Sequence, residues 1–499
     1  MRTKPKILFW INLFFYHFSL AYYLQSHLDA EFFGIIDTNY KPKKFFQNQT
    51  LVKFQKTWFF HDYIKKTLQE PDLTYLENFE KTYKIDLWKL VLNERFFYMH
   101  NRFYKFKREE ILSILEQELK LFESILDEIK PDYFLTYNPV FHHQKLLLEI
   151  CRKKEIKVLN SCRTGINDQT VLVEDGQTFD LDLNQTLEYY NKNKIITTIK
   201  KNIYDSDQKI WIKNREVGIR NKITGLKDYL FDFDNELINS NFMYYGKTKF
   251  KVIKDALSLE YKKTKNYNFI KSLSVSSPSL NIPFVYFPLN INEEASLLHY
   301  APYYTNQVEV IRHIAKSIPI NYVLYVKEHI ASGLRGWNNI KYYKEIMDIP
   351  NVQFIHPEYD NDVLIKNSQL VISIRGTSTL KAVKYGKPTI TFGKQPYQIV
   401  PNVFGVDSLD SLPELICKAL ECKTNPSDYK KFEDYFYIDG FDFPINVYEV
   451  IRNKILLSGN GVFSNVSISN QTMIDFLEKT KNLFSDSVQA HLKIILKNN

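Results

Sequence analysis

The residues best suited to bind a phosphate group lie in one short segment, Ile374-Arg375-Gly376-Thr377-Ser378-Thr379. The segment follows a predicted strand at 370–374 and opens a predicted helix at 378–385. Backbone N–H groups in the first turn of such a helix bind phosphate, and glycine lets the ligand come close. Arg375 adds positive charge and the three hydroxyls add donors. The alternative is an ordinary helix cap made by Thr377 or Ser378.

A second polar group ends the predicted strand at 322–326. Lys327, Glu328 and His329 follow one another there, and Arg335 lies in the next loop. These side chains can bind a phosphate, a base or a sugar carboxylate. A solvated strand end with a surface ion pair is the alternative.

A third group follows the predicted strand at 284–287. It contains Asn290 and the adjacent carboxylates Glu293 and Glu294. Paired carboxylates can do acid–base work. They are equally typical of the first turn of a helix, where the helix dipole favours negative charge.

The N-terminal half offers histidines and one carboxylate. His17 lies at the first predicted strand-to-helix junction, where a catalytic base can stand, and Asp37 ends the second predicted strand. His142 and His143 open a helix. Because adjacent helical positions point about 100° apart, we do not expect both to serve one site. Arg163 is a further candidate, and a structural histidine is the alternative reading of His17.

The sequence does not predict a metal site. Three Asp-x-Asp triplets, Asp180/Asp182, Asp205/Asp207 and Asp232/Asp234, can hold a metal in principle. They lie in a polar region and do not follow a buried strand, so we interpret them as solvated carboxylates. Four irregularly spaced cysteines fit neither a zinc site nor a disulfide framework.

The elements that position these residues alternate between short apolar strands and helices, which predicts an α/β protein with parallel sheets. We expect an N-terminal Rossmann-like domain over 1–175 and a helical insertion over 176–280. A second Rossmann-like domain is expected over 281–425 and a helical tail over 426–499, with a ligand cleft between the two α/β domains.

The expected strands and helices are specific. The strands are Ile7–Ile11, Phe32–Asp37, Tyr133–Thr136, Ile156–Leu159, Phe284–Phe287, Tyr322–Val326, Val352–Ile355, Leu370–Ile374 and Thr389–Phe392. The helices are 17–28, 108–129, 142–153, 217–230, 251–261, 308–317, 342–347, 363–368, 378–385, 411–420 and 473–484. The apolar N-terminus can also be read as a signal anchor, although Asn12 and His17 interrupt it.

Composition narrows the class of protein. The 499 residues carry a formal net charge of +9 without a concentrated basic stripe, so nucleic acid is not an expected partner. Modest basicity suits an anionic small substrate or a membrane surface. The aromatic content of 15% is compatible with a cleft that packs on sugar rings. The cysteine usage favours the cytoplasm, and we expect a cytoplasmic protein that can associate with the inner face of the membrane.

A series of short motifs in the C-terminal half resembles the capsular polysaccharide biosynthesis proteins. The series comprises F-P-L-N, Y-V-K-E-H, I-P-N-V, I-R-G-T-S-T and Y-G-K-P, and it ends near Tyr397. These proteins are glycosyltransferase-like, of the two-Rossmann GT-B type, and include the capsule Kdo transferases. Residues 1–175 resemble them more loosely.

The resemblance implies a metal-independent glycosyltransferase whose only co-substrate besides the glycan is a nucleotide-activated sugar. It places Lys327, Glu328, His329 and Arg335 on the nucleotide side. It also places Gly376 to Thr379 at the phosphate, and Asn290 and Glu294 in the cleft. The acceptor would be a polysaccharide or glycolipid, with His17 or Asp37 as base.

Three positions differ from the family pattern, which often has His for Asn290, Pro for Ile330 and Glu for Lys381. These differences keep two alternatives open. One is a sugar-nucleotide epimerase or CDP-alcohol phosphotransferase of the same fold, and the other is a non-catalytic capsule assembly protein.

Overall fold

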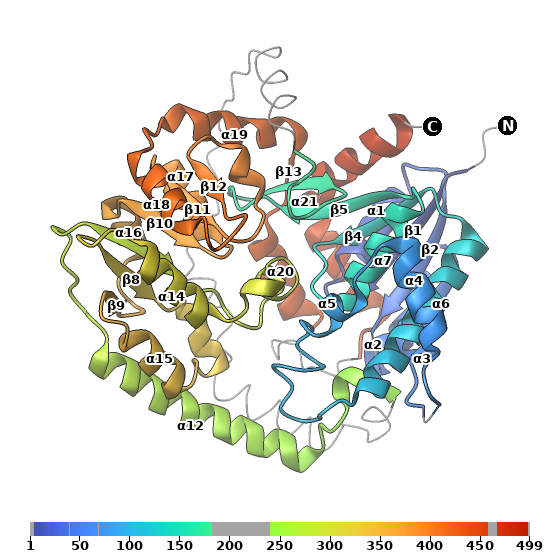
Figure 1. Cartoon of the computed structure of the whole chain (residues 1–499). Helices are drawn as coiled ribbons and strands as arrows, with labels where there is room; N and C mark the ends of the chain where they lie inside the picture. Colours follow the sequence, from blue (N-terminus) through green and yellow to red (C-terminus); the bar gives the residue numbers. More distant parts are fainter. Residues whose placement is uncertain (1–3, 39, 68, 182–239, 458–466, 498–499) are drawn as a thin grey trace. The chain divides into compact units, whose positions relative to one another are not determined.

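The chain forms two compact units. The computed structural model describes residues 4–38, 40–67, 69–181, 240–457 and 467–497 (Figure 1). Of these, unit 1 contains the described residues of 4–176, 240–253 and 436–497, and unit 2 contains 177–181 and 254–435. The chain passes from unit 1 to unit 2 within helix α12 (Lys249–Leu273) and returns within α19 (Pro426–Asp439).

Unit 1 is built on a seven-stranded sheet of order β13-β6-β5-β4-β1-β2-β3. The five strands from β5 to β3 run parallel, whereas β6 and β13 are antiparallel to their neighbours. The strands are β1 (Lys6–Asn12), β2 (Glu31–Asp37), β3 (Phe54–Phe59), β4 (Tyr133–Tyr137), β5 (Lys157–Arg163), β6 (Gln169–Val173) and β13 (Phe441–Asp442).

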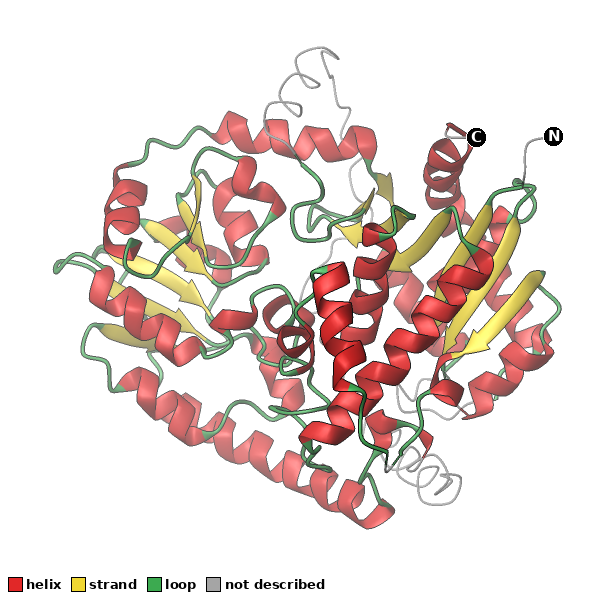
Figure 2. Ribbon diagram, turned by 45° about the vertical axis from the view of Figure 1, so that its right-hand side comes forward, coloured by secondary structure: helices red, strands yellow, loops and turns green. Residues whose placement is uncertain are grey.

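Helices cover both faces of this sheet (Figure 2). They are α1 (Tyr16–Leu24), α2 (Tyr40–Asn48), α3 (Phe60–Tyr63), α4 (Leu73–Tyr83), α5 (Leu87–Val91), α6 (Arg108–Ile129), α7 (His142–Lys153), the 3-10 helix η1 (Phe242–Tyr244), α20 (Ile445–Ile455) and α21 (Asn470–Lys497). Alternate residues of β1 feed two cores because successive side chains point to opposite faces. Leu8 and Trp10 pack with α6 and α7, and Phe9 and Ile11 pack with α1 and α21.

Unit 2 is built on a six-stranded, fully parallel sheet of order β12-β11-β10-β7-β8-β9. Its strands are β7 (Phe284–Pro288), β8 (Val323–Lys327), β9 (Val352–Ile355), β10 (Leu370–Ser373), β11 (Thr389–Thr391) and β12 (Val403–Gly405). Its helices are α13 (Ala295–Leu298), η2 (Pro302–Tyr304), α14 (Gln307–Ser317), η3 (Ile330–Arg335), α15 (Ile340–Met347), α16 (Asn361–Asn367), α17 (Thr377–Lys384), η4 (Pro396–Ile399) and α18 (Leu412–Glu421).

The parallel strands of both units follow the Rossmann order, so the α/β expectation with two Rossmann-like halves is confirmed. In each sheet the chain starts at the centre, moves outward on one side and then returns to the other. The order therefore reverses between β1 and β4 in unit 1, and between β7 and β10 in unit 2. Ligands of such sheets bind beyond the carboxyl ends of the strands at this switch point.

Local sequence accounts for the longest predicted helix of the N-terminal half. Helix α6 covers the expected residues 108–129, with an apolar stripe buried against the sheet. Glu110 accepts a hydrogen bond from the backbone N–H of Lys107, which caps the start. At the other end Lys130 adopts a left-handed conformation with φ of 47°, directly before Pro131, and this stops the helix.

The structure departs from the sequence expectations at the ends of the chain. The helix expected over 17–28 ends at Leu24, and the helix expected over 473–484 extends over Asn470–Lys497. Most of the expected tail 426–499 does not form a separate part: Phe441, Phe476 and Ile495 belong to the core of unit 1. Ser487 and Tyr16 share a buried hydrogen bond of 2.6 Å, which ties α21 to α1.

In the middle of the chain, α12 extends the expected helical patch 251–261 in both directions. The patch 217–230 lies outside the described residues. Within the described part of the chain, the structure contains no helix that is both long and apolar enough to span a membrane. The N-terminal segment forms the expected strand, helix and strand instead.

Candidate functional site

The switch point of unit 2 brings two of the predicted polar segments together. Strands β7 and β10 pair side by side, and Asn290 and Arg375 follow them. The side-chain amide of Asn290 donates a hydrogen bond to the backbone carbonyl of Arg375. Among the described residues, a methyl group added at Gly376 would approach only Asn290 Nδ2, at 3.6 Å. Asn290, Arg375 and Gly376 therefore share one edge of the sheet.

Helix α17 begins at this point without a cap. Gly376 occupies the N-cap position, and no described side chain caps the helix there. The alternative of a cap by Thr377 or Ser378 is therefore not what the structure contains. Thr377 is exposed, and the Ser378 hydroxyl accepts a hydrogen bond of 3.3 Å from Asn361. Uncapped first-turn N–H groups are what a phosphate needs.

Thr379 lies behind the loop. It is fully buried, and its hydroxyl contacts the carbonyl oxygen of Gly376 at 2.8 Å and the hydroxyl of Tyr397. The Tyr397 hydroxyl is also 2.9 Å from the Gly376 carbonyl. Burial raises the pKa of Tyr397 to about 12, so this hydroxyl stays protonated and can donate. Both residues hold the loop in shape, which differs from the direct phosphate contact expected of Thr379.

A chain of amide side chains continues from this loop. Gln307, at the start of α14, is 1% exposed, and its side chain bonds both the N–H and the carbonyl of Asn290 at 2.8 Å. Its Nε2 also donates to Asn292, at 2.5 Å, and Asn292 donates to Asn338, at 2.8 Å. Sequence reasoning missed these residues, because isolated amides carry no pattern until the fold brings them together.

This network of hydrogen-bonded side chains ends at Glu328, which is fully buried. Its carboxylate accepts hydrogen bonds from Tyr343 at 2.8 Å, from Asn338 and Ser332 at 2.9 Å, and from the backbone N–H of His329 at 2.8 Å. Burial raises the pKa of Glu328, and these donors oppose the shift. We had expected Glu328 to line the nucleotide. In the structure it instead supports the loop after β8, because it accepts hydrogen bonds from that loop inside the protein.

The other predicted residues at the end of β8 and in the loop after it differ in exposure. Lys327 is buried with its ammonium group 3.0 Å from the Pro357 carbonyl, and burial lowers its pKa to about 8. Burial and Lys327 together lower the pKa of His329 to about 4, so this imidazole is neutral. Arg335 forms an ion pair with Glu293 at 2.9 Å, and both side chains are more than a third exposed.

Arg375 itself packs on an aromatic ring. Its guanidinium lies 4.5 Å from the centre of the Tyr300 ring, a cation–π contact that limits the positions of the side chain. Glu294 is half-buried and its backbone carbonyl accepts the first hydrogen bonds of α13. Glu294 therefore lies at the start of a helix, which was the alternative interpretation of this carboxylate from the sequence.

In unit 1, His17 belongs to the core. It is 4% exposed, and burial together with the neighbouring His491 lowers its pKa to about 3. A buried, neutral imidazole of this kind is typical of a structural histidine. We therefore correct its assignment from catalytic base to core residue.

Asp37 ends β2 beside two histidines. Its side chain is 8% exposed, with Oδ1 at 3.0 Å from Nε2 of His61 and Oδ2 at 3.5 Å from Nε2 of His143. Burial would raise the pKa of Asp37, but His143 and His61 hold it well below its usual range. Asp37 is therefore an ionised carboxylate. The sequence did not single out His61, which follows β3 and reaches Asp37 only in the folded sheet.

His142 lies between two buried carboxylates. Its Nδ1 is 3.1 Å from Glu94 and its Nε2 is 3.0 Å from Glu118. Burial would lower the pKa of His142, yet Glu118 and Glu94 raise it to about 10. One potential ligand atom from each of Glu118, His142 and His143 lies within 4.8 Å of the others. The structure therefore brings both adjacent histidines near one carboxylate, that of Glu118 on α6, although we had not expected both to serve one site.

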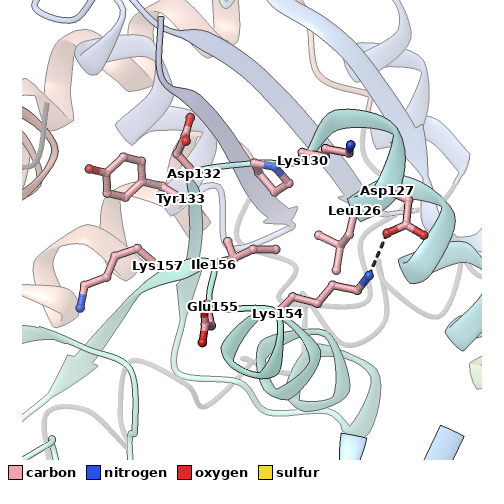
Figure 3. Close-up of a pocket in the computed structure, with 10 residues that line it drawn as sticks. Leu126, Asp127, Lys130, Asp132, Tyr133, Lys154, Glu155, Ile156 and Lys157 are labelled. Atoms are coloured by element: carbon pink, nitrogen blue, oxygen red, sulfur yellow. Dashed lines mark hydrogen bonds and ion pairs between the residues drawn. The ribbon is translucent and has the colours of Figure 1, made fainter. Parts of the chain in front are cut away.

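The remaining candidates do not join these groups. Arg163 is exposed at the end of β5. Asp182, Asp205, Asp207, Asp232 and Asp234 lie outside the described residues, so the structure does not bear on the Asp-x-Asp triplets. A charged pocket lies at the amino ends of β4 and β5, where Lys154 reaches Asp127 at 2.8 Å (Figure 3). This pocket lies at the amino edge of the unit 1 sheet, opposite the carboxyl edge that carries the switch point of that sheet.

Comparison with known proteins supports the family resemblance for part of the chain. Residues 234–401 match the family model of the capsule polysaccharide biosynthesis proteins. This segment contains the loops after β7, β8 and β10. The resemblance seen in the motifs is thereby confirmed for this segment. No curated protein matches the chain.

The comparison with solved structures finds matches at low sequence identity and low TM-score. A UDP-GlcNAc 2-epimerase of Methanocaldococcus jannaschii, in complex with UDP-GlcNAc and UDP, is 12% identical, with 86% of this chain and 98% of that chain covered and a TM-score of 0.27. Thermosulfurimonas dismutans KpsC, a beta Kdo 2,7 transferase, is 11% identical, with coverages of 72% and 89% and a TM-score of 0.31.

Proposed function

We propose that this chain is a glycosyltransferase that moves a sugar from a nucleotide-activated donor to a growing surface polysaccharide. The observation that carries the proposal is the uncapped start of α17 at the switch point of unit 2, with Gly376 open to a ligand. This site lies inside the segment that matches the capsule polysaccharide biosynthesis family. The diphosphate or phosphate of the donor would bind the first-turn N–H groups.

The donor-binding residues divide into those that touch the ligand and those that hold them. Arg375, Gly376, Thr377 and Ser378 are proposed to contact the phosphate. Lys327, His329 and Arg335 are proposed to line the nucleotide, and Asn290 to reach the donor from β7. Thr379 and Glu328 are positioning residues, because both are buried beneath these loops.

The transfer itself needs a proton acceptor and a stabilised leaving group. The acceptor hydroxyl attacks the anomeric carbon, its proton passes to a carboxylate, and the bond from that carbon to the phosphate oxygen breaks. We propose Glu294 for the carboxylate. Asp37, the other candidate, is a weak base because its pKa lies below its usual range. The α17 start and Arg375 would stabilise the departing phosphate without a metal ion.

The acceptor and the location follow from the same proposal. A polysaccharide or glycolipid acceptor would bind unit 1, and the basic chain would work in the cytoplasm at the inner face of the membrane. These points rest on the family resemblance and on charge.

Calorimetry with the nucleotides CMP, UDP, GDP and CDP tests the donor site. One of them should bind the wild-type chain, and Arg375→Ala and Thr377→Ala should weaken that binding at least about tenfold. Arg312→Ala is the matched control, because Arg312 belongs to a partly exposed ion-pair group with Glu309 and Glu345 on unit 2. Unchanged affinity in the two site variants would overturn the assignment.

The type of reaction is tested with the sugar nucleotide whose base binds. A glycosyltransferase leaves the sugar of the donor unaltered until an acceptor glycan is supplied. Conversion of the sugar in the absence of acceptor would favour the epimerase alternative, and glycan binding without nucleotide binding would favour an assembly protein.

A further inference from the structure

Unit 1 contains a buried cluster of histidines and carboxylates that the proposed transfer does not use. Glu118 comes from α6, His142 and His143 come from the start of α7, and Asp37 comes from the end of β2. Glu94 lies shortly after α5 and completes the cluster. The side chains of Glu94, Glu118, His142 and His143 are all fully inaccessible to solvent. A protein core rarely gathers so many polar groups unless something compensates them.

Each histidine of the cluster has a carboxylate beside one ring nitrogen. Glu94 accepts from Nδ1 of His142, which directs Nε2 of the same ring toward Glu118. Asp37 lies 3.5 Å from Nε2 of His143. Among the described residues, neither nitrogen of His143 has a hydrogen-bond partner. A carboxylate behind each imidazole is the arrangement that orients metal-binding histidines.

Three carboxylates, those of Asp37, Glu94 and Glu118, gather in the cluster. Among the described residues the guanidinium of Arg95 lies beside them, with its Nε 3.8 Å from Glu94. A divalent cation would compensate negative charge at this place, and so would protons on the histidines. Metal and protons therefore compete for the same place.

Aromatic rings surround the histidines of the cluster. His143 stacks on Phe60, with ring centres 4.8 Å apart, and on Phe141 at 5.6 Å. Phe97 lies 4.9 Å from the His142 ring. Such a shell excludes water and strengthens binding between a cation and its ligands.

We propose that Glu118, His142 and His143 bind one divalent transition-metal ion of the Zn²⁺ class within unit 1. Two imidazoles and one carboxylate form a three-ligand zinc set that leaves one position for water. Ligand atoms of a tetrahedral zinc site lie about 3.4 Å apart, so atoms that are now up to 4.8 Å apart must approach one another by up to about 1.4 Å when the ion binds.

The ion would brace the carboxyl edge of the unit 1 sheet. It would join α6 to α7 directly, and through Asp37 it would connect both helices to β2. The site belongs to unit 1, whereas the proposed donor loops belong to unit 2. The inference is therefore independent of the proposed glycosyl transfer and of its metal-free chemistry.

Metal binding by the full, untagged chain tests the site. After chelation and desalting, the chain should take up one equivalent of Co²⁺ with the visible absorption of a four-coordinate ion, and one equivalent of Zn²⁺ should displace it. Zn²⁺ should raise the melting temperature by about 5 °C. No stoichiometric uptake of either ion would overturn the proposal and leave protons as the compensating charges.

Variants locate the ion. Glu118→Gln and His143→Gln should each lose the Co²⁺ spectrum and the thermal shift, and Glu118→Gln is nearly isosteric in case His143→Gln fails to fold. His491→Asn is the matched control, since His491 is an equally buried histidine of unit 1 outside the cluster. A spectrum that survives both cluster variants would place the metal elsewhere and overturn the proposal.

Discussion

The carboxyl edges of the two sheets share one strand order and are filled in opposite ways. In unit 1 the edge is closed: Asp37, His61 and His143 meet in the core under aromatic rings. In unit 2 the corresponding edge carries an uncapped helix start and a loop with room for an added methyl group. The comparison teaches that strand order sets where polar groups gather, whereas the loops decide whether a ligand can reach them.

At both edges, buried polar side chains contact one another and hold the loops in place. Unit 1 places ionisable side chains against one another, and unit 2 uses neutral amides that lead from Asn290 through Gln307 to Asn338. Amide side chains hold the loop of Asn290 without titrating, and the network meets one ionisable group where Asn338 donates to Glu328. Three variants sharpen this contrast.

The largest effect is expected from removing the end of the amide chain. Glu328→Ala leaves the buried donors of Tyr343, Asn338 and Ser332 without their acceptor, so unit 2 should lose about 4 kcal/mol of unfolding free energy. Urea unfolding measures this. Glu293→Ala is the control and should cost less than about 1 kcal/mol, because its ion pair with Arg335 is partly exposed. Equal losses in the two variants would contradict the supporting role of Glu328.

Unit 1 should instead respond to acid. Burial lowers the pKa of His491 to about 4 from 6.5. The unfolded chain therefore binds more protons between these values, so the stabilisation is complete above pH 6.5 and declines as the pH falls toward 4. From pH 7 to pH 5 the unfolding free energy should drop by about 2 kcal/mol on account of this residue.

The variant His491→Asn should remove that part of the pH dependence. Its amide can still donate to the Ser487 carbonyl, which His491 now contacts at 2.7 Å. Denaturant unfolding at both pH values gives the comparison. An unchanged slope in the variant would show that His491 is not a source of acid sensitivity.

The smallest effect on stability, with a clear effect on binding, is expected at the open edge. Gly376 has an extended φ of 166°, and its added methyl meets only Asn290 at 3.6 Å among the described residues, so Gly376→Ala should fold normally. The methyl would nevertheless stand where the phosphate is proposed to approach, and nucleotide affinity should fall at least about tenfold.

Gly246→Ala in unit 1 is the counterpart of this variant. Gly246 has a φ of +74°, and its added methyl would stand 2.3 Å from the backbone oxygen of Phe103, so the fold should be destabilised. Melting curves should show a loss of stability in Gly246→Ala but not in Gly376→Ala. Calorimetry should show the loss of nucleotide affinity in Gly376→Ala. Normal nucleotide binding by Gly376→Ala would argue against phosphate at this loop.

Much of the fold could be predicted from local sequence. The helices 108–129 and 142–153 and the strand 352–355 match the expected bounds, because apolar spacing and the stop signal at Lys130-Pro131 act over a few residues. The end of α1 at Leu24 and the length of α21 were not predictable in the same way. Helix α21 extends to Lys497 because it packs against α1 and β13, which are distant in sequence.

The candidate site likewise has features that local sequence predicts and features that depend on the tertiary structure. The amino-acid sequence by itself determined the alternation of strands and helices, and with it that Asn290, Lys327 and Arg375 lie at or just after the ends of strands. Only the tertiary structure decided that Gln307 supports Asn290, that Thr379 and Glu328 lie inside, and that His61, Glu94 and Glu118 join the histidines of α7. Strand ends are set by local apolar runs, whereas burial and hydrogen-bond partners depend on residues brought together from far along the chain.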